Sequence, residues 1–120
     1  MHLSSRTRAL LGGAGILWIA GLAYFSLRRL VPHAAAGTTI HRIEHMAAFG
    51  VLGVLALVLC RSRVQEWLAV LAIVCLALVL EDGQHLLFKN VTFEWWDVRD
   101  DVIGLLFAWL LIRSSGRKLV

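Results

Sequence analysis

Residues 9–27 read ALLGGAGILWIAGLAYFSL, a run of nineteen residues that contains no charged side chain. An α-helix rises 1.5 Å per residue, so this run is just long enough to cross about 30 Å of hydrocarbon. Two arginines precede the run and two follow it. A cleavable signal peptide is the competing interpretation, because HAAAG at 33–37 resembles a cleavage site. We favour a retained transmembrane helix, since the run is long for a signal and arginines follow it directly.

The composition extends this interpretation to the whole chain. Of its 120 residues, 59% are hydrophobic and 17% are charged. A water-soluble domain of this length could not cover so much apolar surface, whereas a bilayer solvates it. One domain over residues 1–120 is the natural division. The formal charge is +4, but the basic residues lie beside the apolar runs, where they anchor topology. We therefore expect membrane lipid as a partner and no nucleic acid.

Three further apolar runs are too short to cross a bilayer alone. They cover residues 46–60, 67–80 and 102–112, which are fifteen, fourteen and eleven residues. A spanning helix needs about twenty, so each run must include neighbouring polar residues. These polar extensions are HRIEH at 41–45, EDGQHLLF at 81–88 and WDVRDD at 96–101. Because the chain reverses direction at each crossing, all three extensions lie at the same membrane face.

The resulting prediction is an all-α integral membrane protein, a four-transmembrane-helix bundle. The expected spans are about 9–27, 42–60, 66–88 and 97–113. The side that holds both termini carries seven of the lysines and arginines, and the polar side carries five. The positive-inside rule then places both termini in the cytoplasm and the polar extensions outside. We expect a multi-pass protein of the cytoplasmic membrane.

Glu81 is the most informative single residue. It follows fourteen apolar residues and precedes Phe88 by seven positions, which places it roughly 10 Å inside the outer end of its helix. An ionised carboxylate that faced lipid at this depth would cost several kcal/mol, so we expect Glu81 to face the bundle interior. Gln84 and His85 follow on the same helical face. A structural polar clasp between helices is the alternative to a functional site.

His41 and His45 are one helical turn apart, as are Asp97 and Asp101. A histidine at a membrane face can carry a proton or bind a metal, but it can also be an interface residue. The aspartate stripe continues through Gly104 and Ala108, and small residues in one stripe indicate contact with other helices. Acids near a helix N-terminus also complement its dipole.

Two further assignments concern the charges around these residues. Asp100 suits the dipole-complementing role better than Asp97 or Asp101 does. Arg42 or Lys89 is the expected cationic partner of the Asp97–Asp101 pair. The candidate metal ligands are His45, Glu81 and Asp97, for a divalent ion such as zinc, manganese or magnesium. Neither HExxH nor a similar spacing supports this metal site.

Three short motifs resemble the VanZ-like family of membrane proteins. They are HRIEHMAAFGVLG at 41–53, Glu81-Asp-Gly-Gln84, and Asp97-x-x-x-Asp101-x-x-Gly104. The sequence departs from the family pattern at three positions. His41 replaces the usual acid, Arg42 replaces the usual lysine, and Asp101 replaces the usual asparagine. An arginine expected between the second and third motifs is missing, and Lys89 or Asn90 lies nearby. The family is linked to tolerance of the glycopeptide antibiotic teicoplanin, and most members have no established biochemical activity.

The prediction for function joins these observations. His45, Glu81, Asp97 and Asp101 are the candidates for chemistry. Gln84, His85, His41, Arg42 and Lys89 are the candidates for binding. The ligand expected at this outward-facing pocket is lipid-linked or amphiphilic, and whether it is turned over is left open. The alternative is a non-enzymatic scaffold or interaction module whose polar network only locks the helices together. A proton conductor is the third hypothesis, and it would require a homo-oligomer.

Overall fold

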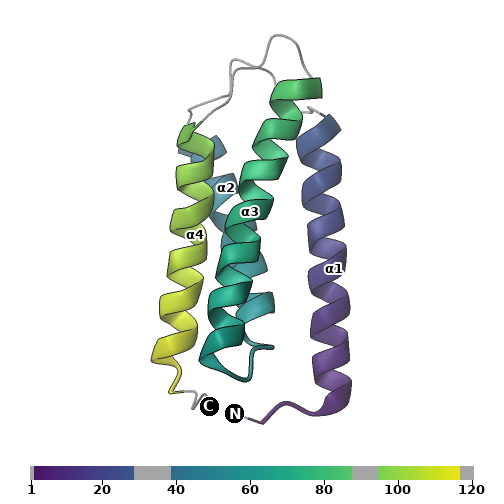
Figure 1. Cartoon of the computed structure of the whole chain (residues 1–120), viewed down its shortest axis with the longest axis vertical. Helices are drawn as coiled ribbons and strands as arrows, with labels where there is room; N and C mark the ends of the chain where they lie inside the picture. The colour runs from purple at the N-terminus through teal and green to yellow at the C-terminus, as the bar shows by residue number, and fades with distance from the viewer. Residues whose placement is uncertain (1, 29–38, 88–94, 117–120) are drawn as a thin grey trace.

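The computed structural model describes residues 2–28, 39–87 and 95–116. These residues form four helices, and the all-α prediction is confirmed. The helices are α1 (Ser5–Arg28), α2 (Thr39–Leu57), α3 (Arg63–Leu87) and α4 (Trp95–Ser114). They run alternately up and down, so that the start of α1 and the end of α4 lie at the same end of the bundle (Figure 1). We call this the arginine end, and the opposite end the histidine end.

Three of the described helices are long and apolar enough to cross a membrane. They are α1 over Ser5–Leu27, α2 over Thr39–Leu57, and α3 over Arg63–Gly83. These segments are compatible with the predicted membrane location. α4 falls outside this class because Asp97, Arg99, Asp100 and Asp101 crowd its first two turns.

Side-chain caps fix where two of the helices begin. The Ser4 hydroxyl accepts a hydrogen bond from the Thr7 amide at 3.1 Å, just before α1. The Ser62 hydroxyl accepts one from the Gln65 amide at 3.2 Å, just before α3. Each bond satisfies an amide that has no partner within its helix, which is the usual reason for serine at an N-cap.

The closest contact between helices joins α2 and α4 through small residues. Gly104 lies directly against the backbone of Met46, with no room for a side chain. A methyl group added at Gly53 would lie 2.8 Å from the Ala108 Cβ atom. The predicted contact of the Gly104–Ala108 stripe with another helix is thereby confirmed. It brings the first turns of α2 and α4 close together at the histidine end.

The core is small, and the outer surface is apolar. The main buried cluster is formed by Phe49, Leu52, Ile73, Ala77, Leu80 and Leu105, from α2, α3 and α4. Large apolar side chains are exposed on all four helices, including Leu17 on α1 and Phe107 on α4. α1 lies against α2 and α3, where the Trp18 indole donates a hydrogen bond to the Ala48 carbonyl at 2.8 Å. An apolar exterior around a small core is the arrangement expected of a protein in lipid.

Candidate functional site

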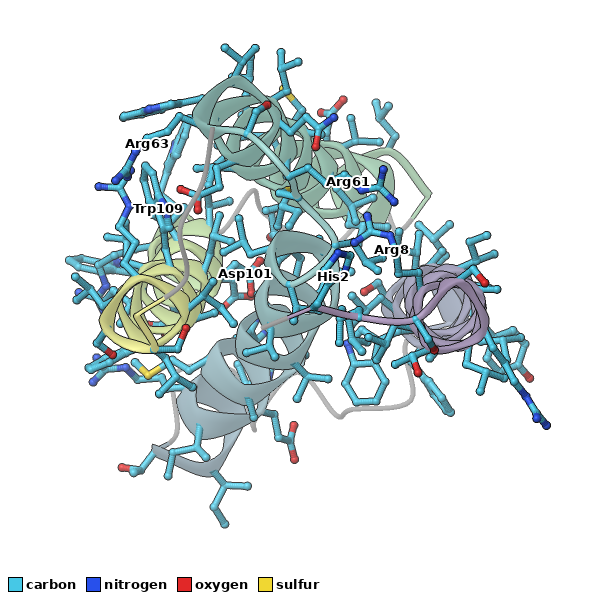
Figure 2. All side chains as sticks on the ribbon, turned by 90° about the horizontal axis from the view of Figure 1, so that it is seen from below. His2, Arg8, Arg61, Arg63, Asp101 and Trp109 are labelled. Atoms are coloured by element: carbon cyan, nitrogen blue, oxygen red, sulfur yellow. The ribbon has the colours of Figure 1, made fainter. Side chains whose placement is uncertain are left out.

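The candidate site lies at the histidine end, where α2 begins, α3 ends and α4 begins (Figure 1). α2 contributes His41 and His45, and α4 contributes Asp97 and Asp101. Figure 2 looks along the bundle from the arginine end and shows Asp101 within it, between α4 and α2. The sequence-predicted residues of these two helices thus lie together.

The contacts between them are specific. The His45 Nδ1 atom lies 2.6 Å from Asp101 Oδ1, and its Nε2 atom lies 3.7 Å from Asp97 Oδ2. The His41 Nε2 atom lies 3.4 Å from Asp97 Oδ1. The two imidazole rings meet edge to face with their centroids 4.6 Å apart. Asp97 therefore lies next to the Nε2 atoms of both histidines, while Asp101 contacts the Nδ1 atom of His45.

Glu81 reaches this group from α3. Its side chain is buried, with 4% of the residue exposed, so it faces the interior and not lipid, as its depth in the helix predicts. Its carboxylate acts electrostatically on the His45 imidazole. The side chains of Gln84 and His85, and the whole of Lys89, lie outside the described part of the structure. Their predicted binding roles stay predictions.

Asp100 does more than complement the helix dipole, which is the role that the sequence favoured. It is fully buried and contacts two arginines. Arg42 Nε lies 3.3 Å from its Oδ2 atom, and Arg99 Nη2 lies 3.2 Å from its Oδ1 atom. Arg42 therefore pairs with Asp100, whereas the sequence suggested Asp97 and Asp101. The Arg99 guanidinium also lies over the Trp96 ring, 4.5 Å from its centroid.

A second polar cluster, which sequence analysis missed, lies at the arginine end. Glu66 on α3 is 1% exposed and accepts a hydrogen bond from the Trp109 indole at 2.9 Å. Arg113 Nε lies 3.4 Å from the same Glu66 oxygen, and the guanidinium lies over the Trp109 ring. Glu66 begins one expected span and Arg113 ends another, so both lie at the same end of the bundle. Their pairing could have been predicted from this. The cluster ties α3 to α4.

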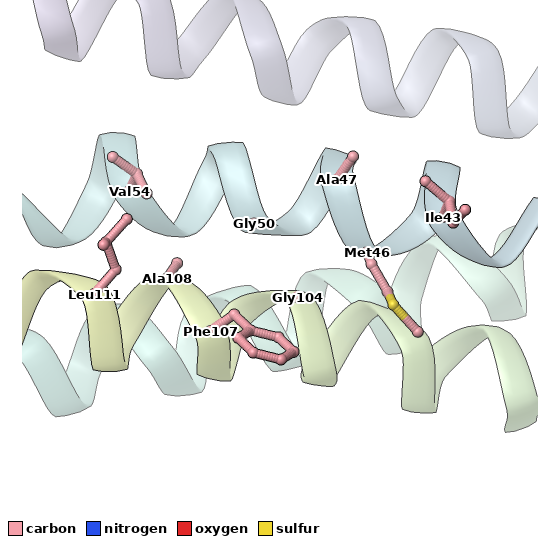
Figure 3. Close-up of a pocket in the computed structure, with 9 residues that line it drawn as sticks. All are labelled: Ile43, Met46, Ala47, Gly50, Val54, Gly104, Phe107, Ala108 and Leu111. Carbon is pink, nitrogen blue, oxygen red and sulfur yellow. The ribbon is translucent and has the colours of Figure 1, made fainter.

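An apolar groove runs between α2 and α4 (Figure 3). Its volume is about 460 Å³, and its lining includes Ile43 and Gly50 from α2 and Phe107 and Leu111 from α4. Ile43 and His45 are two residues apart, or about 200° around the helix, so the groove and the histidines occupy opposite faces of α2. The groove is an apolar surface next to the site and not part of it.

The donor atoms of His41, His45 and Asp97 all lie within 4.8 Å of one another and could hold a metal ion. The sequence-predicted set contained Glu81 in place of His41. Buried imidazole beside carboxylate also suits proton transfer. Comparisons with family models, with characterised proteins and with solved structures found no match for this chain. The function of the chain is therefore inferred from the chemistry of its site.

Proposed function

We propose that this chain is a VanZ-like integral membrane protein of the cell envelope that crosses the cytoplasmic membrane four times. The support for α4 as the fourth span is the direction in which its charged side chains point. Asp100 and Asp101 are buried, while Leu106, Phe107 and Leu110 are exposed. Charged residues that face the bundle interior do not pay the cost of contact with lipid. The twenty residues of α4 also supply the length of about 30 Å that a span needs.

The orientation places the histidine end outside the cell and both termini in the cytoplasm. Its support is the excess of arginine at the other end, where Arg8 lies in the first turn of α1 and Arg61 and Arg63 lie around the start of α3. Cationic side chains are retained on the cytoplasmic side of membrane proteins.

The proposed role of the site is to bind the polar part of a lipid-linked or amphiphilic ligand. One observation carries this proposal: two histidines and three carboxylates from three helices converge at the histidine end of the bundle. Burying so many ionisable groups is costly, and such groups in membrane proteins generally mark a functional path or site. The apolar chains of the ligand would lie along the exposed apolar faces of the helices.

Within such a complex, the chain's residues have separate tasks. Asp101 orients His45, and the Glu81 carboxylate acts electrostatically on the same imidazole from α3. Asp97 on α4 and His41 on α2 both contact the ligand. An effect on teicoplanin tolerance would follow if the ligand is an envelope precursor.

The test compares Glu81→Gln and Asp97→Asn with Asp82→Asn, a change at an exposed neighbour of Glu81. The three variants are expressed in a teicoplanin-susceptible bacterium, and their membrane-inserted amounts are matched. We expect the first two to lose the tolerance conferred by the wild type and to lose lipid retained in native mass spectrometry, while Asp82→Asn keeps both. Unchanged tolerance and lipid retention in Glu81→Gln would refute the proposal.

The scaffold alternative has its own support in the two polar contacts that join α2 and α4. His45 contacts Asp101, and Arg42 contacts Asp100, both across the closest helix interface in the bundle. A pure lock predicts that every variant at these positions lowers stability in detergent, with no retained lipid in the wild type. Lipid retention by the wild-type protein separates the two functions.

A further inference from the structure

We infer that the histidine end holds one divalent transition-metal ion of the zinc class, bound by His41, His45 and Asp97. The inference deepens the proposed function, since it names the cofactor of the same site, and it rests on the same convergence of helices. Asp101 is assigned as a positioning residue that acts through His45. The open coordination position is left for water or for an oxygen of the bound ligand.

The distances between the donor atoms suit such an ion. Zinc binds nitrogen and oxygen ligands at about 2.0–2.2 Å, so two ligands of a tetrahedral site lie about 3.3–3.6 Å apart. The His41 Nε2 atom lies 3.4 Å from Asp97, and the His45 Nε2 atom lies 3.7 Å from it. All three donors lie within 4.8 Å of one another. Only small side-chain rotations would bring them around a common centre.

The bond between His45 and Asp101 supplies a second, independent argument. The Nδ1 atom lies 2.6 Å from the Asp101 carboxylate, and the Nε2 atom faces the Asp97 carboxylate at 3.7 Å. A cation between Nε2 and Asp97 would contact both. Metal-bound histidines nearly always donate their other ring nitrogen to a carboxylate or a carbonyl, which fixes the tautomer. Asp101 occupies that position.

The placement of charged groups at this end favours the same ion. Glu81, Asp97, Asp100 and Asp101 are acidic side chains of this end that are not exposed. The arginines paired with them, Arg42 and Arg99, both contact Asp100. The carboxylates of Asp97 and Asp101 lie instead against the two histidines. A divalent cation bound here would place positive charge beside them, in a region where unbalanced charge is costly.

The structure corrects the sequence-based view that no motif spacing supports a metal site, because it pairs His45 with His41 where the sequence-predicted set had Glu81. Residues 41–45 read HRIEH, which fits the H-x-x-E-H order of one class of zinc enzymes. The spacing places both imidazoles on one helical face, as the structure shows. Glu44 is exposed and lies outside the ligand group. Two imidazoles with one carboxylate favour zinc or a neighbouring transition metal over magnesium or calcium, which prefer oxygen ligands.

The experiment uses the full chain, purified in detergent through a tag without histidines, and dialysed against zinc and then against zinc-free buffer. We expect about one zinc per chain by mass spectrometry of the metal, and tetrahedral d–d absorption bands when cobalt replaces it. His41→Ala and Asp97→Asn should lower zinc affinity at least a hundredfold, measured by chelator competition. Asp101→Asn should lower it about 10- to 100-fold as a positioning residue.

Two control variants keep the test independent of folding. Glu66→Gln disturbs the buried cluster at the arginine end, and Asp82→Asn removes an exposed acid near the site. Both should bind zinc with the affinity of the wild type. Wild-type protein that carries no zinc at saturation, or a His41→Ala variant with unchanged affinity, would overturn the inference. Retained lipid in metal-free protein would then show that the proposed ligand site stands without the metal.

Discussion

The substitution Gly104→Ala tests the helix contact on which the site depends. A Cβ atom at this position would lie within 2.9 Å of both the Cα and the carbonyl carbon of Met46, and closer still to the carbonyl oxygen. These are backbone atoms, so no side-chain rotation relieves the overlap, and α2 must move away from α4. Overpacking of this kind costs about 1–3 kcal/mol. Alanine regains about 1 kcal/mol of helix propensity over glycine. The expected net loss is about 1 kcal/mol and at most about 2 kcal/mol, or roughly five- to thirtyfold in the folding equilibrium.

The assay is unfolding in detergent by a rising fraction of SDS, followed by tryptophan fluorescence. Two matched variants serve as controls. A Cβ atom at Gly50 would lie 3.5 Å from the Gly104 carbonyl oxygen, which is ordinary contact, and one at Gly13 would meet nothing within 4 Å. Both variants should be as stable as the wild type or slightly more stable. Gly104→Ala protein with the stability of Gly50→Ala would refute the reasoning, because the two helices would then not be in close contact.

The remaining predictions concern the arginine end, the orientation and α1. Glu66→Gln should lower stability by about 1–3 kcal/mol in the same assay, because it removes the charge that Arg113 contacts; Glu44→Gln, at an exposed acid, should change nothing. Asp82→Cys, in a protein whose Cys60 and Cys75 are replaced by serine, should react with an impermeant maleimide added outside intact cells, and labelling only after lysis would reverse the orientation. Trp18→Phe should cost about 1 kcal/mol, since it removes the hydrogen bond to the Ala48 carbonyl, whereas Leu17→Ala, at an exposed neighbouring side chain, should have little effect on stability.

The convergence of the site residues could be predicted because it depends on length and chain reversal alone. The apolar runs are too short without their polar neighbours, so His45, Glu81 and Asp97 had to reach the same end. The burial of Glu81 followed from the cost of a carboxylate in lipid. Neither the convergence nor the burial had to be derived from a known rotation of each helix about its axis.

The partners of individual side chains could not be predicted, because they depend on that rotation. Trp95–Ser114 carries apolar residues around its whole circumference beyond the first two turns, so periodicity does not choose a face. The backbone contact at Gly104 does, and it turns Asp100 toward Arg42 and Asp101 toward His45. The pairing of Glu66 with Arg113 was missed because each residue lies at the limit of an expected span, 66–88 or 97–113.

Asp100 and its neighbours have different kinds of partner within one end of the bundle. Asp100 has two guanidinium partners, which tie α2 to α4. Asp97 and Asp101 meet histidines, and imidazole can bind a metal ion or carry a proton, as guanidinium cannot. A network with locking as its sole task would need only permanent partners such as arginine, because an unpaired buried carboxylate is costly. The histidines beside Asp97 and Asp101 are therefore the feature that favours the proposed metal and ligand site over a lock.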